Sequence, residues 1–295
     1  MTNDTGKVFQ NIHEIALKDK TFRERSMKRY SLEEFGFDTL ENFNCCVFGC
    51  GAGGTEILNL LELGAKFVNG IDLIPEYIST TEEELKRFKG KYKLTVGSIL
   101  EHPYQNEEFD FVTCNGVIHH IDKDFDALKQ IARTVKKGGY AYLEVAGKGG
   151  IIDELVKGTM RNYYKNEKNF KEIVDNLSVD NIRNALNWMK SEIKGNKSEA
   201  SKKSIVILDS ISDLIDNDLV QCVLDRMQAP IYKGYTQKQF EDMLSEVGFT
   251  SWKRISRKPS FNNIRNLAVP FYAQHEHFLS KLLYKDGQLS MMCKK

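Results

Sequence analysis

Apolar residues recur along this chain in two alternating patterns, as short unbroken runs and as longer stretches with helical spacing. Short buried runs are typical of strands in a parallel sheet, and the stretches between them are typical of helices packed on its faces. From residue 43 onward we therefore predict alternating strands and helices, and hence an α/β fold. The predicted strands include 45–48, 67–71, 109–115, 140–145, 249–256 and 288–293.

An insertion with helical spacing interrupts this alternation between about residues 150 and 230. One helix begins at Ile151, a second at Val179 has Ser178 as its candidate N-cap, and a third covers 205–227. The stretch 194–203 is polar and is predicted to be a linker. Helices added after the fifth strand stand over the carboxyl ends of the strands, where ligands bind. We expect a lid over the substrate, with a dimerisation or structural element as the alternative.

The first predicted strand leads directly into a glycine-rich turn and a helix. Gly49, Gly51 and Gly53 fit the G-x-G-x-G pattern of S-adenosylmethionine (SAM) enzymes. Gly49, Gly51 and Gly54 fit the dinucleotide pattern G-x-G-x-x-G. Glycines permit positive φ angles and the close approach of a ligand, and the helix N-terminus directs N–H groups at the turn. Asp72 follows the next apolar run, where a carboxylate can bind the hydroxyl groups of a ribose. These features predict a nucleotide site without naming the nucleotide.

Motifs downstream of the turn separate the two cofactors. Residues 109–120 read FDFVTCNGVIHH, and a helix and the sequence VKKGGY at 135–140 follow them. Over roughly residues 41–146 the series resembles the class I SAM-dependent methyltransferases, especially the small-molecule branch typified by the ubiquinone and menaquinone biosynthesis enzymes (type 11). The resemblance implies a doubly wound, mostly parallel, seven-stranded Rossmann-like sheet with an antiparallel last strand, here carrying an all-helical lid insertion. A nicotinamide-dependent dehydrogenase remains the alternative.

The resemblance also implies how the chain is divided and what it does. We expect an N-terminal helical cap (1–40), a SAM-binding core (41–149), a helical lid or substrate insertion (150–230) and the C-terminal part of the core sheet (231–295). The implied enzyme transfers a methyl group from SAM, leaving S-adenosyl-L-homocysteine, to a small-molecule acceptor. Two other functions stay open: methylation of a peptide or RNA, and a SAM-fold protein without methyl transfer.

Site residues carry over from the family onto matching positions. The implied cofactor-binding residues are Gly49, Cys50, Gly51, Gly53, Asp72, Leu73, Gly97, Ser98, Ile99, Asn115 and Gly116. The family commonly has an acidic residue two positions before the first glycine, where it steadies the methionine amino group, and this chain has Val47. The backbone carbonyls of Gly49 and Asn115 are candidate partners for that group. A second departure is Ser98, where the family often has aspartate to accept from the adenine amino group.

Methyl transfer from a sulfonium needs alignment and desolvation more than covalent help, because the leaving group is already activated. A base is required only if the acceptor enters protonated. The candidate catalytic residues are His119 and His120, which are equally compatible with a structural turn. The aromatic candidates for substrate contact, which are also compatible with helix packing, are Tyr163, Tyr164, Tyr232 and Tyr235.

Composition narrows the class of protein. The formal net charge is +1 with no dense basic block, which argues against nucleic acid as a partner. The six cysteines have no metal-ligand spacing, so we expect reduced thiols, no metal and a cytoplasmic protein. No apolar run approaches the ~20 residues of a membrane span. A homodimer formed through the helical insertion is a further expectation.

Overall fold

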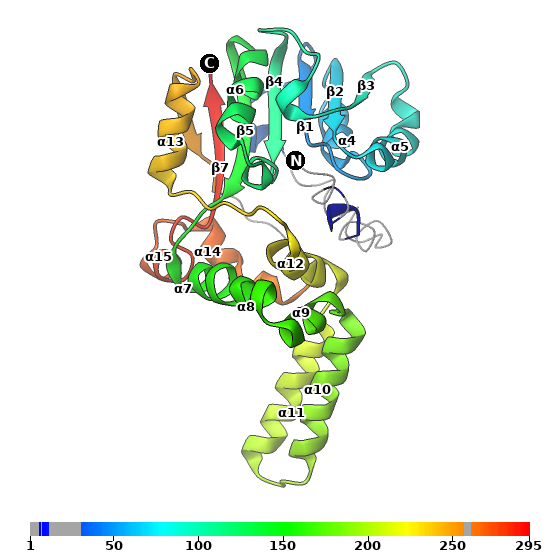
Figure 1. Ribbon diagram of the computed structural model, residues 1–295, viewed down its shortest axis with the longest axis vertical. Coiled ribbons are helices and arrows are strands. Elements are labelled where there is room, and N and C mark those ends of the chain that lie inside the picture. Colours follow the sequence, from blue (N-terminus) through cyan, green and yellow to red (C-terminus); the bar gives the residue numbers. More distant parts are fainter. Residues whose placement is uncertain (1–5, 7, 12–30, 257–260) are drawn as a thin grey trace.

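One mixed sheet organises the protein. The computed structural model describes residues 6, 8–11, 31–256 and 261–295. Within them seven strands form a sheet in the order β3-β2-β1-β4-β5-β7-β6 (Figure 1). Strands β1 to β5 pair in parallel, whereas β7 runs antiparallel between β5 and β6, as predicted. The strands are β1 (Asn44–Phe48), β2 (Phe67–Asp72), β3 (Tyr92–Val96), β4 (Phe109–Asn115), β5 (Val135–Ala146), β6 (Ser251–Arg254) and β7 (Gln288–Lys294).

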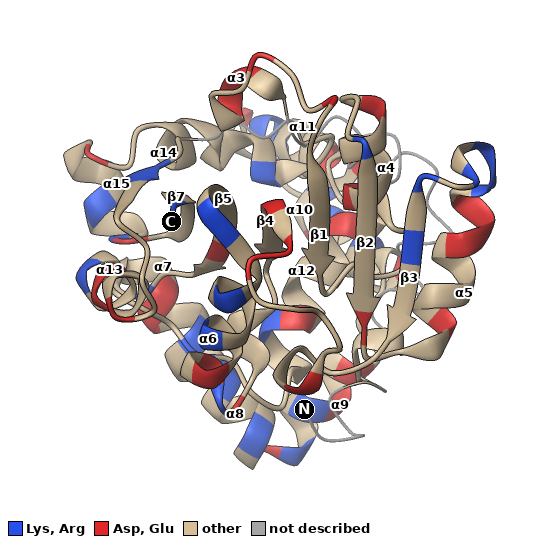
Figure 2. Ribbon diagram, turned by 90° about the horizontal axis from the view of Figure 1, so that it is seen from above, with Lys and Arg blue, Asp and Glu red and all other residues tan. Residues whose placement is uncertain are grey.

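Helices cover both faces of the sheet (Figure 2). One face packs against α3 (Leu32–Phe35), α4 (Thr55–Glu62) and α5 (Pro75–Glu84), and the other against α6 (Asp124–Thr134) and α13 (Gln237–Glu246). Alternate residues of β1 serve the two layers, because Cys45 and Val47 belong to the first apolar cluster while Cys46 and Phe48 belong to the second. Burial on both faces explains why the strand reads as an unbroken apolar run.

Capping side chains fix the start of the helix predicted at Val179 and the start of α13. The Ser178 hydroxyl accepts a hydrogen bond from the Asn181 N–H at 3.1 Å, which begins α10 (Val179–Lys194). At α13 the Thr236 hydroxyl accepts from the Gln239 N–H, and the Gln239 side chain accepts from the Thr236 N–H. These bonds satisfy N–H groups that the first helical turn leaves without partners.

The insertion is helical, but two of its predicted boundaries were wrong. The expected helix over 205–227 is two helices, because the chain turns at residues 214–216 and Asp216 caps the second one through the Leu219 N–H. The polar stretch 194–203 is not a linker throughout, since Ser198 caps a helix that starts at Glu199. The insertion comprises α7 (Gly150–Ile152), η4 (Asp153–Met160), α8 (Arg161–Asn166), α9 (Lys168–Asp175), α10, α11 (Glu199–Asp213) and α12 (Asn217–Gln228).

Helices near the C-terminus join the insertion, which the sequence did not lead us to expect. The Ile264 N–H donates to the Leu214 carbonyl at 3.0 Å, and the Asn263 amide donates to the carboxylates of Asp216 and Asp218. Figure 1 shows α14 and α15 beside α7 and α12, with the α10–α11 hairpin projecting away from the sheet. These elements are η5 (Ile264–Ala268), α14 (Val269–Ala273) and α15 (Phe278–Leu283).

Three short helices follow strands or helices of the core: η1 (Lys86–Phe88), η2 (Ile99–Glu101) and η3 (Ile118–His120). The helix expected after residues 109–120 is α6, which ends at Thr134, because β5 already begins at Val135 and Gly138 lies inside that strand. Of the predicted N-terminal cap, α3 is helical, and most of residues 1–30 lies outside the described part of the chain.

Candidate active site

The glycine turn sits at the carboxyl end of β1, in the centre of the sheet. Gly49 has a φ of 73°, and a β-carbon there would lie 2.5 Å from Val117, so this glycine is required by packing. Gly51 and Gly116 also have positive φ angles, 64° and 72°, yet a β-carbon on either would have no atom within 4 Å. The turn after β1 and the turn after β4 therefore have open space beside their backbones, which fits a ligand lying over both.

Asp72 at the end of β2 holds this turn in place. Its Oδ2 accepts from the Gly51 N–H at 2.9 Å and its Oδ1 from the Ile74 N–H at 3.0 Å. Burial raises the pKa of Asp72, while the backbone N–H groups of Gly51, Ile74 and Leu73 oppose the rise. Each carboxylate oxygen retains a second lone pair. Asp72 thus lies where a ribose is expected and also orders the glycine turn.

The other predicted cofactor residues follow neighbouring strands. The Gly97 N–H donates to the Asp72 carbonyl at 2.8 Å, and Ser98 caps η2 by accepting from the Leu100 N–H. The Gly116 N–H donates to the Glu144 carbonyl at 3.1 Å. Because β1 to β4 are parallel, their carboxyl ends and the turns that follow them meet at one edge of the sheet. Gly53, Leu73, Ile99 and Asn115 lie in these same strand ends and turns.

The two histidines of η3 are buried, and the proton is on a different ring nitrogen in each. His119 Nδ1 accepts from the Ala146 N–H at 3.3 Å, so a neutral ring carries its proton on Nε2. His120 Nδ1 lies 2.8 Å from the Ile231 carbonyl, which can only accept, so this nitrogen carries the proton. His120 Nε2 is 3.6 Å from Asp225 Oδ1. The unprotonated nitrogen of His119 is therefore Nδ1, whose lone pair already accepts from the Ala146 N–H. The unprotonated nitrogen of His120 is Nε2.

Burial keeps both imidazoles neutral near pH 7. It lowers the pKa of His119 well below its usual range, and His120, Lys157 and Arg226 lower it further. Burial also lowers the pKa of His120, but the Asp225 carboxylate and the Ile231 carbonyl oppose this shift. Of the two rings, His120 is the one arranged to accept a proton and to have the resulting charge stabilised.

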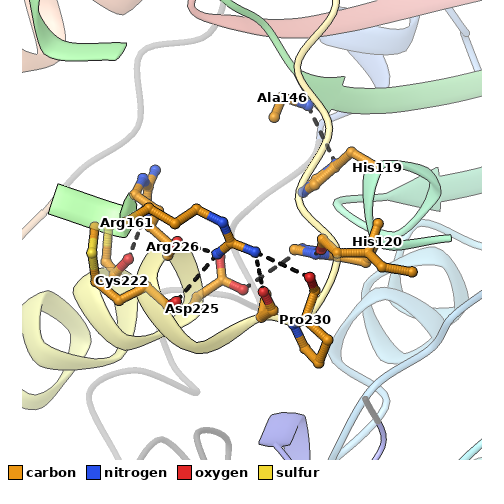
Figure 3. Close-up of polar contacts among 11 residues, drawn as sticks. His119, His120, Ala146, Arg161, Cys222, Asp225, Arg226 and Pro230 are labelled. Carbon is orange, nitrogen blue, oxygen red and sulfur yellow. Dashed lines mark hydrogen bonds and ion pairs between the residues drawn. The ribbon is translucent and has the colours of Figure 1, made fainter. Parts of the chain in front are cut away.

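Residues of the insertion and of the segment that follows it pack on the histidines (Figure 3). The Tyr232 ring lies 5.2 Å from the ring of His119 and 5.4 Å from that of His120, with Lys157 and Arg161 over its face. Burial raises the pKa of Tyr232 to about 12, so it remains a neutral phenol. The sequence pattern that selected Tyr232 gave no hint of Lys157 or Arg161, which lie some 70 residues away in the chain.

The other three tyrosines considered as substrate contacts lie elsewhere. Tyr163 stacks edge-on against Phe170, and the Tyr164 hydroxyl donates to Asp175 at 2.8 Å. The Tyr235 hydroxyl donates to Asp124 at the start of α6. The structure therefore brings Tyr232 to the histidines and leaves Tyr163, Tyr164 and Tyr235 in contacts within the helical layers.

Two carboxylates beside Asn115 were missed by the sequence analysis. Glu56 in the first turn of α4 accepts from the Asn115 amide at 3.4 Å. Glu144 of β5 is 1% exposed and accepts from the hydroxyls of Tyr142 and Ser290. Glu56 follows the glycine turn by only three residues, a signal that could have been used. Glu144 carries no such signal, because its partner Ser290 comes from β7, far along the chain.

Comparisons with known proteins identify the domain. The family model for the methyltransferase domain matches residues 47–143. A demethylmenaquinone methyltransferase of Alkalihalophilus pseudofirmus is 36% identical over 73 residues, which cover 24% of this chain and 31% of that protein. Residues 47–143 belong to a class I SAM-dependent methyltransferase domain. An uncharacterized protein of Methanocaldococcus jannaschii is 29% identical over 119 residues, 40% of this chain and 48% of that protein. The matches to these curated relatives span less than half of the relatives' lengths.

Solved structures share the fold of the methyltransferase domain. A chain of the complex between the Haloferax volcanii Trm112 methyltransferase activator and a methyltransferase superposes with a TM-score of 0.53. The superposition covers 97% of this chain and 96% of that chain at 12% identity. This likeness shows the fold alone.

The methyltransferase domain fits SAM, the cofactor of its family, by its open turns and by Asp72. All six cysteines are free, and five of them are buried. Among the described residues there is no group of ligands that could hold a metal ion. No helix in the described ranges is long and apolar enough to cross a membrane.

Proposed function

We propose that this protein transfers a methyl group from SAM to a small-molecule acceptor that binds between the strand ends and the helical insertion. When bound, SAM supplies an activated methyl group, and the chain's own residues have to orient the acceptor and exclude water. Gly51, Gly116 and Asp72 are the residues that would hold the cofactor. The resemblance to demethylmenaquinone methyltransferase supports a small acceptor.

The packing of the insertion, and of the segment that follows it, on η3 is the observation that carries this proposal. The Lys233 N–H donates to the His119 carbonyl at 2.9 Å, and Lys157 donates to the Gly147 carbonyl at 2.6 Å. Tyr232 and Asp225 bring a phenol and a carboxylate to the two histidines. These contacts support the proposal that the insertion is a lid, which covers the substrate site at the carboxyl ends of the strands.

We assign the role of general base to His120. Its Nε2 is the unprotonated nitrogen, and the nearby Asp225 carboxylate stabilises the imidazolium that forms when the ring takes a proton. The His119 Nδ1 lone pair is occupied by the Ala146 N–H, so His119 serves as a donor through Nε2. This arrangement suits an acceptor whose oxygen or nitrogen loses a proton during transfer.

The projecting hairpin supports a second use of the insertion. Trp188 of α10 and Val206 of α11 are 65% and 64% exposed, although large apolar side chains usually avoid such exposure. We propose that the hairpin forms contacts between two copies of the chain. A peptide or RNA substrate guided by the hairpin is the alternative to a small acceptor.

The proposed function is tested by incubating the protein with SAM labelled in its methyl group and with a small-molecule extract. We expect the label in compounds below about 1 kDa and stoichiometric S-adenosyl-L-homocysteine. The His120→Asn protein serves as the control for transfer that does not depend on the site. Label found only in peptide or RNA would move the acceptor to the macromolecular class, and no transfer by a protein that binds SAM would favour a different use of the cofactor.

A further inference from the structure

The chain lacks the strand carboxylate that its family uses near the methionine amino group. Val47 stands at that position, is fully buried, and packs in the apolar cluster that contains Phe111 and Tyr142. No polar contact can come from its side chain. A cofactor amino group bound at the turn would therefore contact a carboxylate from another element, or would contact no carboxylate.

Glu56 brings a carboxylate to the same end of the sheet from the other side of the glycine turn. It lies in the first turn of α4, where the helix dipole favours a negative charge. Its Oε1 accepts from Asn115 Nδ2 at 3.4 Å, which links it to the last residue of β4. Open space lies beside the backbone both at Gly51 in the turn and at Gly116 after β4.

The carboxylate of Glu56 lies near two buried thiols at this end of the sheet. Its negative charge contributes to raising the pKa of Cys50, in the glycine turn, and that of Cys114, in β4, although burial is the larger cause for both. Asn115 points to the same face of the sheet as Phe111, the face that α4 covers.

We propose that Glu56 binds the amino group of the cofactor's methionine moiety and replaces the acidic residue that is missing at position 47. A carboxylate bound to an ammonium group forms charge-assisted hydrogen bonds, which are stronger than the carbonyl contacts otherwise available at Gly49 and Asn115. Asn115 then acts as a positioning residue that orients the Glu56 side chain. This inference rests on the proposed use of SAM.

The test measures binding of S-adenosyl-L-homocysteine and of its analogue with hydrogen in place of the α-amino group. Calorimetry is done on the unchanged protein, on Glu56→Gln, and on Glu62→Gln. Glu62 lies on the same helix, at the end remote from the turn, and pairs with Arg87 on the surface. We expect the unchanged protein and Glu62→Gln to prefer the amino ligand by about ten- to a hundredfold, and Glu56→Gln to bind both ligands alike.

Three results would overturn the assignment, and they are distinguishable. If Glu56→Gln keeps the full preference, the amino group is held by other atoms. If it loses affinity equally for both ligands, Glu56 only supports the fold of the turn. If the unchanged protein binds S-adenosyl-L-homocysteine without any preference, the amino group is not recognised. Failure of the unchanged protein to bind either ligand would instead defeat the proposed function itself.

Discussion

Gly51 and Gly90 have the same kind of backbone conformation at opposite edges of the sheet. Both have positive φ angles, 64° and 87°, and a β-carbon on either would meet no atom within 4 Å. Gly90 precedes β3 at its amino end, whereas Gly51 follows β1 at its carboxyl end. Alanine at each position should strain the backbone by about 1 to 2 kcal/mol.

We predict that only Gly51→Ala weakens SAM binding, because only that β-carbon would enter the space of the cofactor. The measurements are the SAM dissociation constant and the thermal midpoint on the same preparation. We expect Gly51→Ala and Gly90→Ala to lose equal stability and to differ at least tenfold in their affinity for SAM. Normal SAM binding by Gly51→Ala would place the cofactor elsewhere.

His120 and Asp225 make a prediction about pH. Since burial lowers the pKa of His120, transfer should be independent of pH near neutrality and should decline only in acid, when the ring becomes protonated. The Asp225 carboxylate raises this pKa, so Asp225→Asn should move the decline to still lower pH. His120→Asn keeps a donor for the Ile231 carbonyl and should lower kcat by about a hundredfold or more.

His119→Asn is the matched comparison, because an amide oxygen can still accept from the Ala146 N–H. It should lower kcat much less than His120→Asn does and should leave the acid decline in place. The profile of kcat against pH for the four proteins checks both statements. Equal losses of kcat for the two histidine variants, with no movement of the acid decline in Asp225→Asn, would contradict the assignment of His120 as the general base.

At the scale of elements, Arg161 ties α8 to the end of α12. Its guanidinium donates to the carbonyls of Arg226, Met227, Ala229 and Pro230, which include the last carbonyls that α12 leaves without helical partners. The bonds to Met227 and Ala229 are buried, and the other two are partly buried. The segment that follows carries Tyr232 to the histidines, so this one side chain helps to position Tyr232.

Arg161→Met should therefore lower the free energy of unfolding by about 2 to 4 kcal/mol, because several acceptors lose their donor. It should also lower transfer more than SAM binding, since the cofactor turn is untouched. Arg87→Met is the control, because that exposed pair with Glu62 contributes little. Denaturant unfolding and calorimetry are the measurements. A change in Arg161→Met no larger than in the control would show that the lid does not depend on this contact.

The sheet and its crossover helices could be predicted from the sequence because their signals are local. The run 45–48, its glycines and the capping box at Thr236 each specify an element within a few residues. The helical insertion was also evident, but its turn at 214–216 was not, since the apolar spacing continues through it. The packing of the insertion against residues 261–283 depends on hydrogen bonds from Asn263 to Asp216 and Asp218, which no local sequence pattern indicates.

The site followed the same division. Spacing alone predicted that the glycine turn and Asp72 lie together, as the bond from the Gly51 N–H shows, and their contact with the cofactor stays a prediction. The distinction between His119 and His120 could not, since it depends on the carbonyl of Ile231 and the N–H of Ala146. Three tyrosines were suggested by aromatic spacing and lie in contacts of the helical layers, which that spacing serves equally well.

At the scale of the whole molecule, the sheet and the insertion meet where two chain segments pass between them. Residues 146–148 and 233–235 run side by side there, with the Tyr235 N–H donating to Ala146 and the Lys148 N–H donating to Tyr235. Amide exchange in α7 to α9 and α12 should therefore slow when S-adenosyl-L-homocysteine and an acceptor bind together, because the lid closes on them.

The α10–α11 hairpin provides an internal reference in the same experiment, because it projects away from the site (Figure 1). Its exchange should not respond to the ligands. High protection of α7 to α9 without ligands, unchanged on binding, would favour a fixed structural layer over a lid.

The central claim is that the glycine turn and Asp72 form a SAM site. Calorimetric titration of the unchanged protein with SAM and, separately, with NAD tests it most directly. We expect one SAM bound per chain and no heat of binding from NAD. Binding of NAD without SAM, or no binding of SAM by the folded protein, would contradict the account.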